Sequence, residues 1–121
     1  MTGLPLRVSP TLKTLEPNDR VTNTTVNSSR MPNYGKTLLT SSTTGPFLLE
    51  DPIPGVRKVI VQTSTSTTGR TVTGKTTTIL FATATAGNVT ITFDAVGDLI
   101  ELEGRTSLIW DVISNQNATL S

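Results

Sequence analysis

The chain of 121 residues carries a formal net charge of +1 and contains neither cysteine nor histidine. It therefore has no disulfide framework, no thiolate metal site and no Ser–His or Cys–His nucleophile pair of its own. The small charge gives no strong field toward nucleic acid or an anionic membrane, and no run is apolar and long enough to span a bilayer. At this length we expect one domain, with or without an arm.

Threonine dominates the composition, with 25 of the 121 residues, whereas apolar residues make up only 35%. Threonine favours strands and resists helix because its branched Cβ restricts χ1. A chain this polar buries only a slim core by itself, and small folds of that kind often gain stability by oligomerising. The composition thus predicts strands and favours an oligomer.

Residues 1–35 differ from the remainder of the chain, because they contain prolines at positions 5, 10, 17 and 32 and only isolated apolar residues. Proline and the residue before it favour extended backbone. Leu4, Leu6 and Val8 alternate, as in a strand that adds to the sheet edge of a partner. We therefore predict an extended N-terminal arm that becomes ordered against a partner, while a disordered tail remains the alternative. The residues expected to bind are Leu4, Leu6, Val8, Leu12 and Leu15.

From residue 36 to residue 121 short apolar runs alternate with turn signals every 8 to 12 residues or so, a spacing typical of a sandwich or barrel. We predict a small all-β domain of six to seven short strands, without a helix longer than one turn. The expected strands lie at 36–42, 47–49, 56–64, 77–84, 89–95, 99–104 and 107–114.

The stretch GRTVTGKT, residues 69–76, fits the phosphate-loop pattern G-x-x-x-x-G-K-[ST]. That motif must follow a buried strand and open a helix, whose N-terminus then holds the phosphates. Downstream, Ile79 and Phe81 alternate with polar or small residues, which indicates a strand. The Walker-B-like LIWD at 108–111 lies too near the end of the chain to help. We therefore predict a polar hairpin loop, with Gly69 and Gly74 in turns, and no nucleotide site.

Several charged residues raise alternative interpretations. Glu101 and Glu103 share one face of an expected strand, about 7 Å apart. Paired carboxylates can act in glycosidases, but a solvated or ion-paired face is the interpretation that we favour. Arg57 and Lys58 would pair with carboxylates of a neighbouring subunit or lie on a solvated edge that discourages wrong strand pairing. Asp51, just before Pro52, is expected to cap a turn.

The apolar residues of the expected strands are assigned to core or trimer packing. Leu108, Trp110 and Val112 would share one face of the last strand. Trp110, the only tryptophan, would pack in the core or between subunits, or would instead form a sugar-stacking platform. The residues assigned to this packing are Phe47, Leu49, Val59, Val61, Ile91, Phe93 and Trp110.

The order of turns and strands over residues 36–114 resembles a small β-domain of tailed-bacteriophage structural proteins, found in capsid decoration (cement) proteins, head fibres and tail fibres. The similar features are a Pro-x-Pro-Gly corner at 52–55, a basic apolar strand at 57–61, a Gly-Asp turn at 97–98, a glycine turn at Gly104 and a final strand holding Trp110. The threonine-rich segment at 63–78 is longer and more polar than in that pattern.

The resemblance implies a non-enzymatic homotrimer that binds and stabilises the capsid shell. Its partner would be the major capsid protein of the same virion, reached through the N-terminal arm. The protein would lie on the outer capsid surface after assembly in the host cytoplasm. No catalytic residue, cofactor, metal, nucleic acid, membrane or small-molecule substrate is expected. The alternative is a fibre or spike domain that binds a host receptor or glycan.

Overall fold

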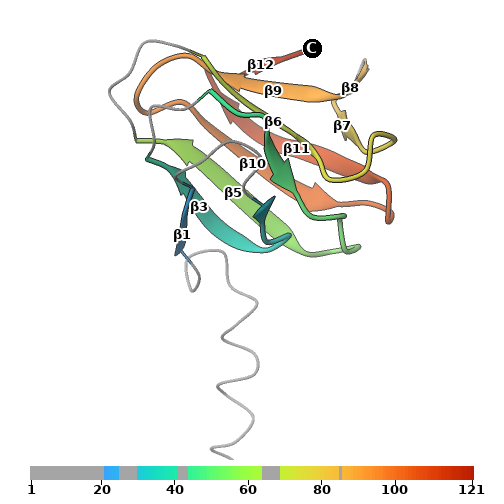
Figure 1. The fold of residues 1–121 in the computed structure, drawn as a ribbon. Helices are drawn as coiled ribbons and strands as arrows, with labels where there is room; N and C mark the ends of the chain where they lie inside the picture. The colour runs from blue at the N-terminus through green and yellow to red at the C-terminus, as the bar shows by residue number, and fades with distance from the viewer. Residues whose placement is uncertain (1–20, 25–29, 41–43, 64–68, 85) are drawn as a thin grey trace, which may run out of the picture.

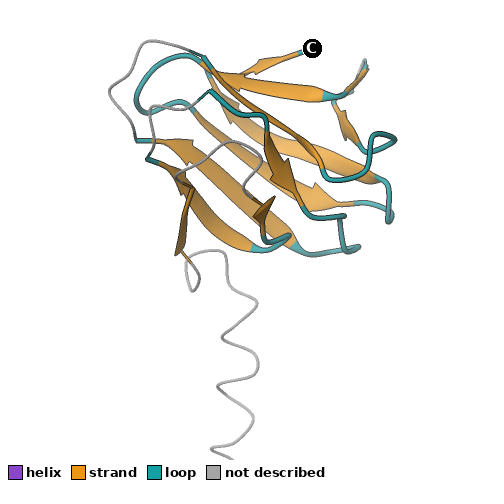
Figure 2. Cartoon of the chain, viewed as in Figure 1, coloured by secondary structure: helices purple, strands orange, loops and turns teal. Residues whose placement is uncertain are grey.

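The computed structural model describes residues 21–24, 30–40, 44–63, 69–84 and 86–121. In these residues the regular secondary structure consists of strands alone (Figures 1 and 2). Hence no helix in this part of the chain could cross a membrane. The all-β prediction is confirmed, but the strands are more numerous and shorter than expected. They are β1 (Val21–Thr24), β2 (Arg30–Met31), β3 (Gly35–Leu39), β4 (Phe47–Leu49), β5 (Arg57–Gln62), β6 (Arg70–Gly74), β7 (Leu80–Ala82), β8 (Gly87–Asn88), β9 (Thr90–Phe93), β10 (Leu99–Gly104), β11 (Ile109–Gln116) and β12 (Thr119–Leu120).

The strands form two sheets, which we call sheet A and sheet B. Sheet A has seven strands in the order β1-β3-β5-β10-β11-β7-β8, and sheet B has five in the order β12-β9-β6-β4-β2. Both sheets are mixed: β3 and β5 are parallel, for example, whereas β5 and β10 are antiparallel. Each sheet has two edge strands, so the sheets form a sandwich and not a closed barrel.

The core lies between the two sheets, because alternate side chains of each strand point inward. In β3, β5 and β10 every second residue is buried. Burying one large aliphatic or aromatic side chain contributes about 1.5–3 kcal/mol, so this cluster is the main source of stability. It comprises Met31, Leu39, Phe47, Leu49, Ile60, Val72, Ile79, Phe81, Ile91, Phe93, Ile100, Leu102, Trp110 and Ala118.

Five of the seven residues assigned to packing lie in this core, namely Phe47, Leu49, Ile91, Phe93 and Trp110. For Val59 and Val61 a place in the core is wrong, because both lie half-buried on the opposite face of β5. The run RKVIVQ offers apolar residues at three successive positions, so periodicity alone does not set the inward face. Pairing with β10 sets it, since Ile60 lies beside Ile100 and both point inward.

The boundary placed at residue 35 falls inside the β-domain. β1 pairs in parallel with β3, and β2 pairs in parallel with β4. Met31, within the expected arm, is fully buried in the core. These strands are short and mostly polar, so their sequence did not distinguish them from an extended arm. The residues expected to bind the capsid, Leu4, Leu6, Val8, Leu12 and Leu15, lie outside the described residues.

The predicted hairpin loop at 69–76 is also wrong, because most of it is strand. Arg70–Gly74 forms β6, which lies between β4 and β9 in sheet B. Arg70 and Val72 point inward and are fully buried, whereas Thr71 and Thr73 lie on the other face. β6 has a single apolar residue, Val72, flanked by threonines and preceded by arginine. This pattern is not typical of a central strand, which explains the error.

Candidate functional site

The residues of the phosphate-loop pattern occupy a strand and the turn that follows it. Gly69 precedes β6 and Gly74 ends it, and the turn closes with the Ile79 N–H donating to the Thr76 carbonyl at 3.0 Å. β7 then begins at Leu80, so the segment opens no helix that could hold phosphates. The Lys75 ammonium lies 3.3 Å from a Glu50 carboxylate oxygen. The motif residues therefore stabilise the β6–β7 turn.

Asp51 stabilises the same turn, which differs from its expected role as a local cap. Its carboxylate accepts a hydrogen bond from the Thr76 hydroxyl at 3.1 Å. Its backbone carbonyl accepts one from the Asn33 side-chain amide at 2.7 Å. Beside the turn lies a cavity of about 260 Å³ without a charged lining residue. It is lined by Thr73, Gly74, Thr76, Thr77, Ile79 and Val89.

The paired carboxylates of β10 form ion pairs, as the sequence favoured. Arg57 Nε donates to Glu103 Oε1 at 2.8 Å, and Arg57 Nη1 donates to Glu101 Oε2 at 2.9 Å. The hydrogen bond to Glu103 and, next in size, the hydrogen bond to Glu101 raise the pKa of Arg57 above its ordinary value. Both carboxylates thus accept hydrogen bonds from one guanidinium of the same chain, whereas the sequence also allowed Arg57 to pair with a neighbouring subunit.

Lys58 is buried, and its prediction as a solvated edge residue is wrong. Its Nζ donates to Thr37 Oγ1 at 2.5 Å and to the Tyr34 carbonyl at 3.3 Å. Burial lowers the pKa of Lys58 to about 7. The sequence analysis did not foresee this burial because it treated Arg57 and Lys58 together, whereas adjacent residues of a strand point to opposite faces.

Trp110 lies fully inside the sandwich, so its ring is not presented as a sugar platform. Leu108 does not share this environment, because it belongs to the turn before β11 and is 45% exposed. Val112 packs partly against the core. Only Trp110 and Val112 of the expected trio therefore point toward the interior.

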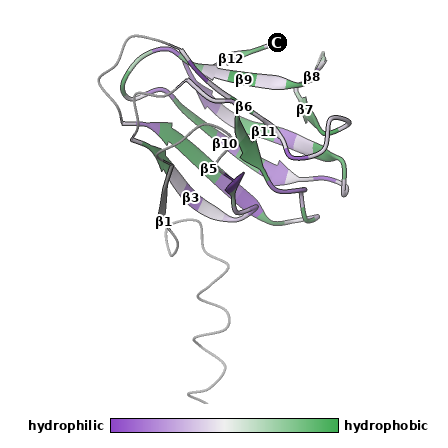
Figure 3. Ribbon diagram, in the orientation of Figure 1, coloured by the Kyte–Doolittle hydropathy of each residue, from purple (hydrophilic) through white to green (hydrophobic). Residues whose placement is uncertain are grey.

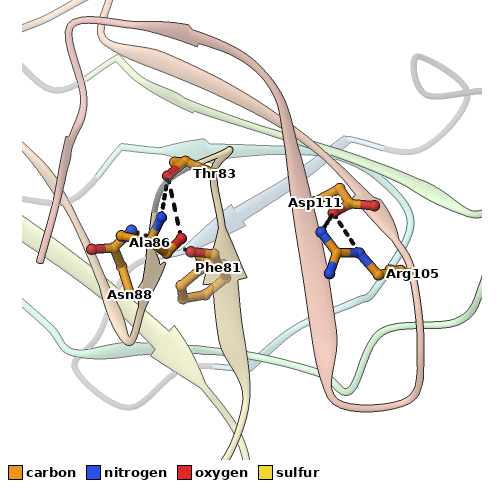
Figure 4. A network of polar contacts seen from close by, with 6 residues as sticks. All are labelled: Phe81, Thr83, Ala86, Asn88, Arg105 and Asp111. Carbon is orange, nitrogen blue, oxygen red and sulfur yellow. Dashed lines mark hydrogen bonds and ion pairs between the residues drawn. The ribbon is translucent and has the colours of Figure 1, made fainter.

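Figure 4 shows two polar clusters around β7, β8 and the start of β11. In the β7–β8 hairpin, the Thr83 hydroxyl donates to the Ala86 carbonyl at 3.2 Å, and the Asn88 amide donates to the Phe81 carbonyl at 3.3 Å. Arg105 pairs with Asp111, with its Nε 2.8 Å from Oδ1. That pair closes the turn that leads into β11, so both clusters have a structural role.

The strongest candidate for a binding surface is the face of sheet A that points away from sheet B, which we call the outer face. Figure 3 shows that β5 is hydrophilic at its start and hydrophobic over its middle. One end carries Arg57 with its two glutamates, whereas the other end carries half-buried aliphatic residues. The outer face of β3, β5 and β10 comprises Lys36, Leu38, Arg57, Val59, Val61, Leu99, Glu101 and Glu103.

Comparison of the chain with protein-family models, curated proteins and solved structures gave no match. What the protein does is therefore inferred from its own residues and their arrangement.

Proposed function

We propose that the protein is a non-enzymatic decoration (cement) protein of a tailed-phage capsid. It binds the major capsid protein on the outer surface of the shell as a homotrimer and stabilises the shell. The features that resemble phage β-domains fall on the strands and turns of one sandwich. The corner at 52–55 precedes β5, the Gly97–Asp98 turn precedes β10, and Trp110 of β11 lies in the core.

The observation that carries the proposal is that two of these motifs, about fifty residues apart in sequence, pack against each other. Pro54 forms a β-bridge with Gly104. The Gly55 N–H donates to the Gly104 carbonyl at 2.9 Å, and the Gly104 N–H donates to the Val56 carbonyl at 3.0 Å. A side chain at position 104 would collide with the Ile53 carbonyl. The Pro-x-Pro-Gly corner and the glycine turn thus form one unit, which supports the resemblance.

The Gly97–Asp98 turn is joined to the end of β5 in the same manner. The Asp98 carboxylate accepts the N–H groups of Asp94 and Ala95, each at 3.0 Å. The Gln62 N–H donates to the Asp98 carbonyl, and the Gly97 N–H donates to the Gln62 carbonyl, both at 2.8 Å. Gly97 adopts a φ of 93°, which favours glycine. Again a motif of the resemblance has a definite structural task.

Attachment to the capsid is assigned to the residues before β1, which include Leu4, Leu6, Val8, Leu12 and Leu15. β1, the strand that follows these residues, is an edge strand of sheet A. Three such segments on one trimer would bind together and multiply weak contacts through avidity.

The test is co-sedimentation of the purified protein with shells of the major capsid protein from the same genome, together with a native mass measurement. We expect a mass three times that of the chain and saturable binding that raises the melting temperature of the shell. A glycan array serves as the contrasting measurement. A monomer without affinity for the shell would contradict the proposal, and glycan binding without shell binding would favour a fibre or spike domain.

A further inference from the structure

We infer that the outer face of sheet A is the surface through which copies of this chain contact each other. The inference rests on the homotrimer of the proposed function and names the surface that such an assembly uses. The occupant is a second copy of the chain, whose own charged and aliphatic residues complement this face.

The apolar end of the outer face is a row of side chains from three neighbouring strands. Leu38 of β3 pairs in register with Val61 of β5, and Val61 pairs with Leu99 of β10. Val59 lies on the same face, two residues from Val61 along β5. All four are half-buried, and the strands of sheet B pack on the opposite side. Neighbouring strands are about 4.8 Å apart, so the row forms a continuous apolar strip.

The charges of the outer face are arranged so that one copy complements another. Arg57 holds Glu101 and Glu103, which leaves this trio with a net charge of −1. Lys36 lies on β3 in register with Val59, and Val59 lies in register with Glu101. Two strand spacings, about 9.6 Å, therefore separate the Cα positions of Lys36 and Glu101. Among the described residues Lys36 forms no ion pair.

On the outer face, the Lys36 cation and the net negative Glu101–Arg57–Glu103 trio thus lie on opposite sides of Val59. A second copy can place its Glu101–Arg57–Glu103 trio against Lys36 while the two apolar strips meet. In a ring of three copies such a contact is heterologous, with the Lys36 side of one copy against the glutamate side of the next. Because Arg57 already neutralises one carboxylate, burying the trio costs less than burying two free carboxylates.

The first experiment replaces an apolar residue at the centre of the strip. We expect Val61→Arg to weaken self-association at least about 30-fold, as for a central interface residue. Val96→Arg is the matched control, because Val96 is 59% exposed in the turn between β9 and β10. Sedimentation equilibrium measures the association, and far-UV circular dichroism checks folding. The control should associate like the wild type.

The second experiment exchanges charges and does not depend on the apolar variant folding. We expect Lys36→Glu and Glu101→Lys each to weaken self-association about tenfold when the variant is alone. An equal mixture of the two variants should associate more tightly than either variant does alone. Such mutual rescue requires contact between different molecules. Retention of a wild-type trimer by Val61→Arg, or absence of rescue in the mixture, would overturn the inference.

The remaining outcomes separate this inference from the proposed function. A trimer that persists in all variants and still binds shells keeps the decoration role and rejects this surface. A monomeric wild type rejects the assembly itself. If deletion of residues 1–20 newly exposes Val61 to a cysteine-directed label in Val61→Cys, the chain's own N-terminal segment covers the face, and the inference fails. The absence of native cysteine makes that labelling specific.

Discussion

At the scale of single residues, Lys58 shows how one buried polar group changes the response of the molecule to pH. Its ammonium has two oxygen acceptors, the Thr37 hydroxyl and the Tyr34 carbonyl, and burial lowers its pKa from 10.5 to about 7. The folded-state pKa therefore lies below the unfolded value. Between pH 7 and 10.5 the unfolded chain binds more protons at this residue, so the free energy of unfolding rises with pH.

We expect this dependence to appear in urea unfolding between pH 7 and 9.5. The wild type should gain stability with a slope of at most about 1.4 kcal/mol per pH unit from Lys58. Lys58→Met should lack that component and should be more stable than the wild type at pH 7. Lys75→Met, which removes a lysine from the β6–β7 turn, should keep the wild-type slope. Parallel slopes for the wild type and Lys58→Met would contradict the assignment.

Gly104 is the second residue whose identity the structure explains, because a Cβ there would overlap the backbone carbonyl of Ile53. Backbone atoms cannot move aside as the end of a side chain can. We expect Gly104→Ala to lower the free energy of unfolding by about 1–3 kcal/mol, the usual cost of overpacking. Gly87→Ala is the control, since the nearest atom is Leu80 Cδ1 at 3.3 Å, at the end of a flexible side chain. Equal denaturation midpoints for both variants would contradict the prediction and would mean that the backbone of the corner at 52–55 shifts to accommodate the added Cβ.

At the scale of elements, the strands that the sequence revealed are those in which alternation is clean. In β9 apolar and polar residues alternate, and the structure buries the expected Ile91 and Phe93. β6 escaped notice because only Val72 is apolar among its inward residues, beside a buried Arg70. Inward Lys58 and Gln62 hid the register of β5 for the same reason. A polar side chain on a core face removes the signal on which periodicity depends.

The candidate site was predictable only in part. Glu101 and Glu103 are two residues apart on one strand, so their common face followed from the sequence. Their shared partner Arg57 required the pairing of β5 with β10, which are far apart in the chain. The row Leu38–Val61–Leu99 required the order β3-β5-β10, in which the connections are not sequential. Local patterns do not specify such neighbours.

The β6–β7 element provides a contrast between a surface charge and a core residue. The Lys75 and Glu50 side chains are each about one-third exposed and pair near the surface, so Lys75→Ala should cost less than about 1 kcal/mol. Val72→Ala, a few residues away in β6, should cost about 2 kcal/mol because Val72 is fully buried. Thermal or urea unfolding measures both. Nucleotide binding should stay at background in the wild type and in Lys75→Ala, and affinity that is lost in the variant would revive the phosphate-loop interpretation.

At the scale of the whole molecule, the position of β1 decides where the chain can be cut. β1 pairs with β3 over four residues, from Val21 beside Lys36 to Thr24 beside Leu39. A truncation that removes residues 1–20 leaves every described strand in place. A truncation that removes residues 1–30 deletes β1 and half of β2 and leaves β3 as an unpaired edge. The two deletions therefore test different parts of the molecule.

We expect the protein lacking residues 1–20 to fold, to remain a trimer and to bind shells weaker by orders of magnitude, because the avidity of three segments is lost. The protein lacking residues 1–30 should also melt at a lower temperature, since it loses the hydrogen bonds between β1 and β3. Native mass, thermal unfolding and co-sedimentation with shells separate the three effects. Undiminished decoration by the shorter truncation would transfer capsid binding from the N-terminal segment to the β-domain. Loss of the trimer in that variant would instead mean that residues 1–20 hold the copies together, and the outer face of sheet A would lose its proposed role.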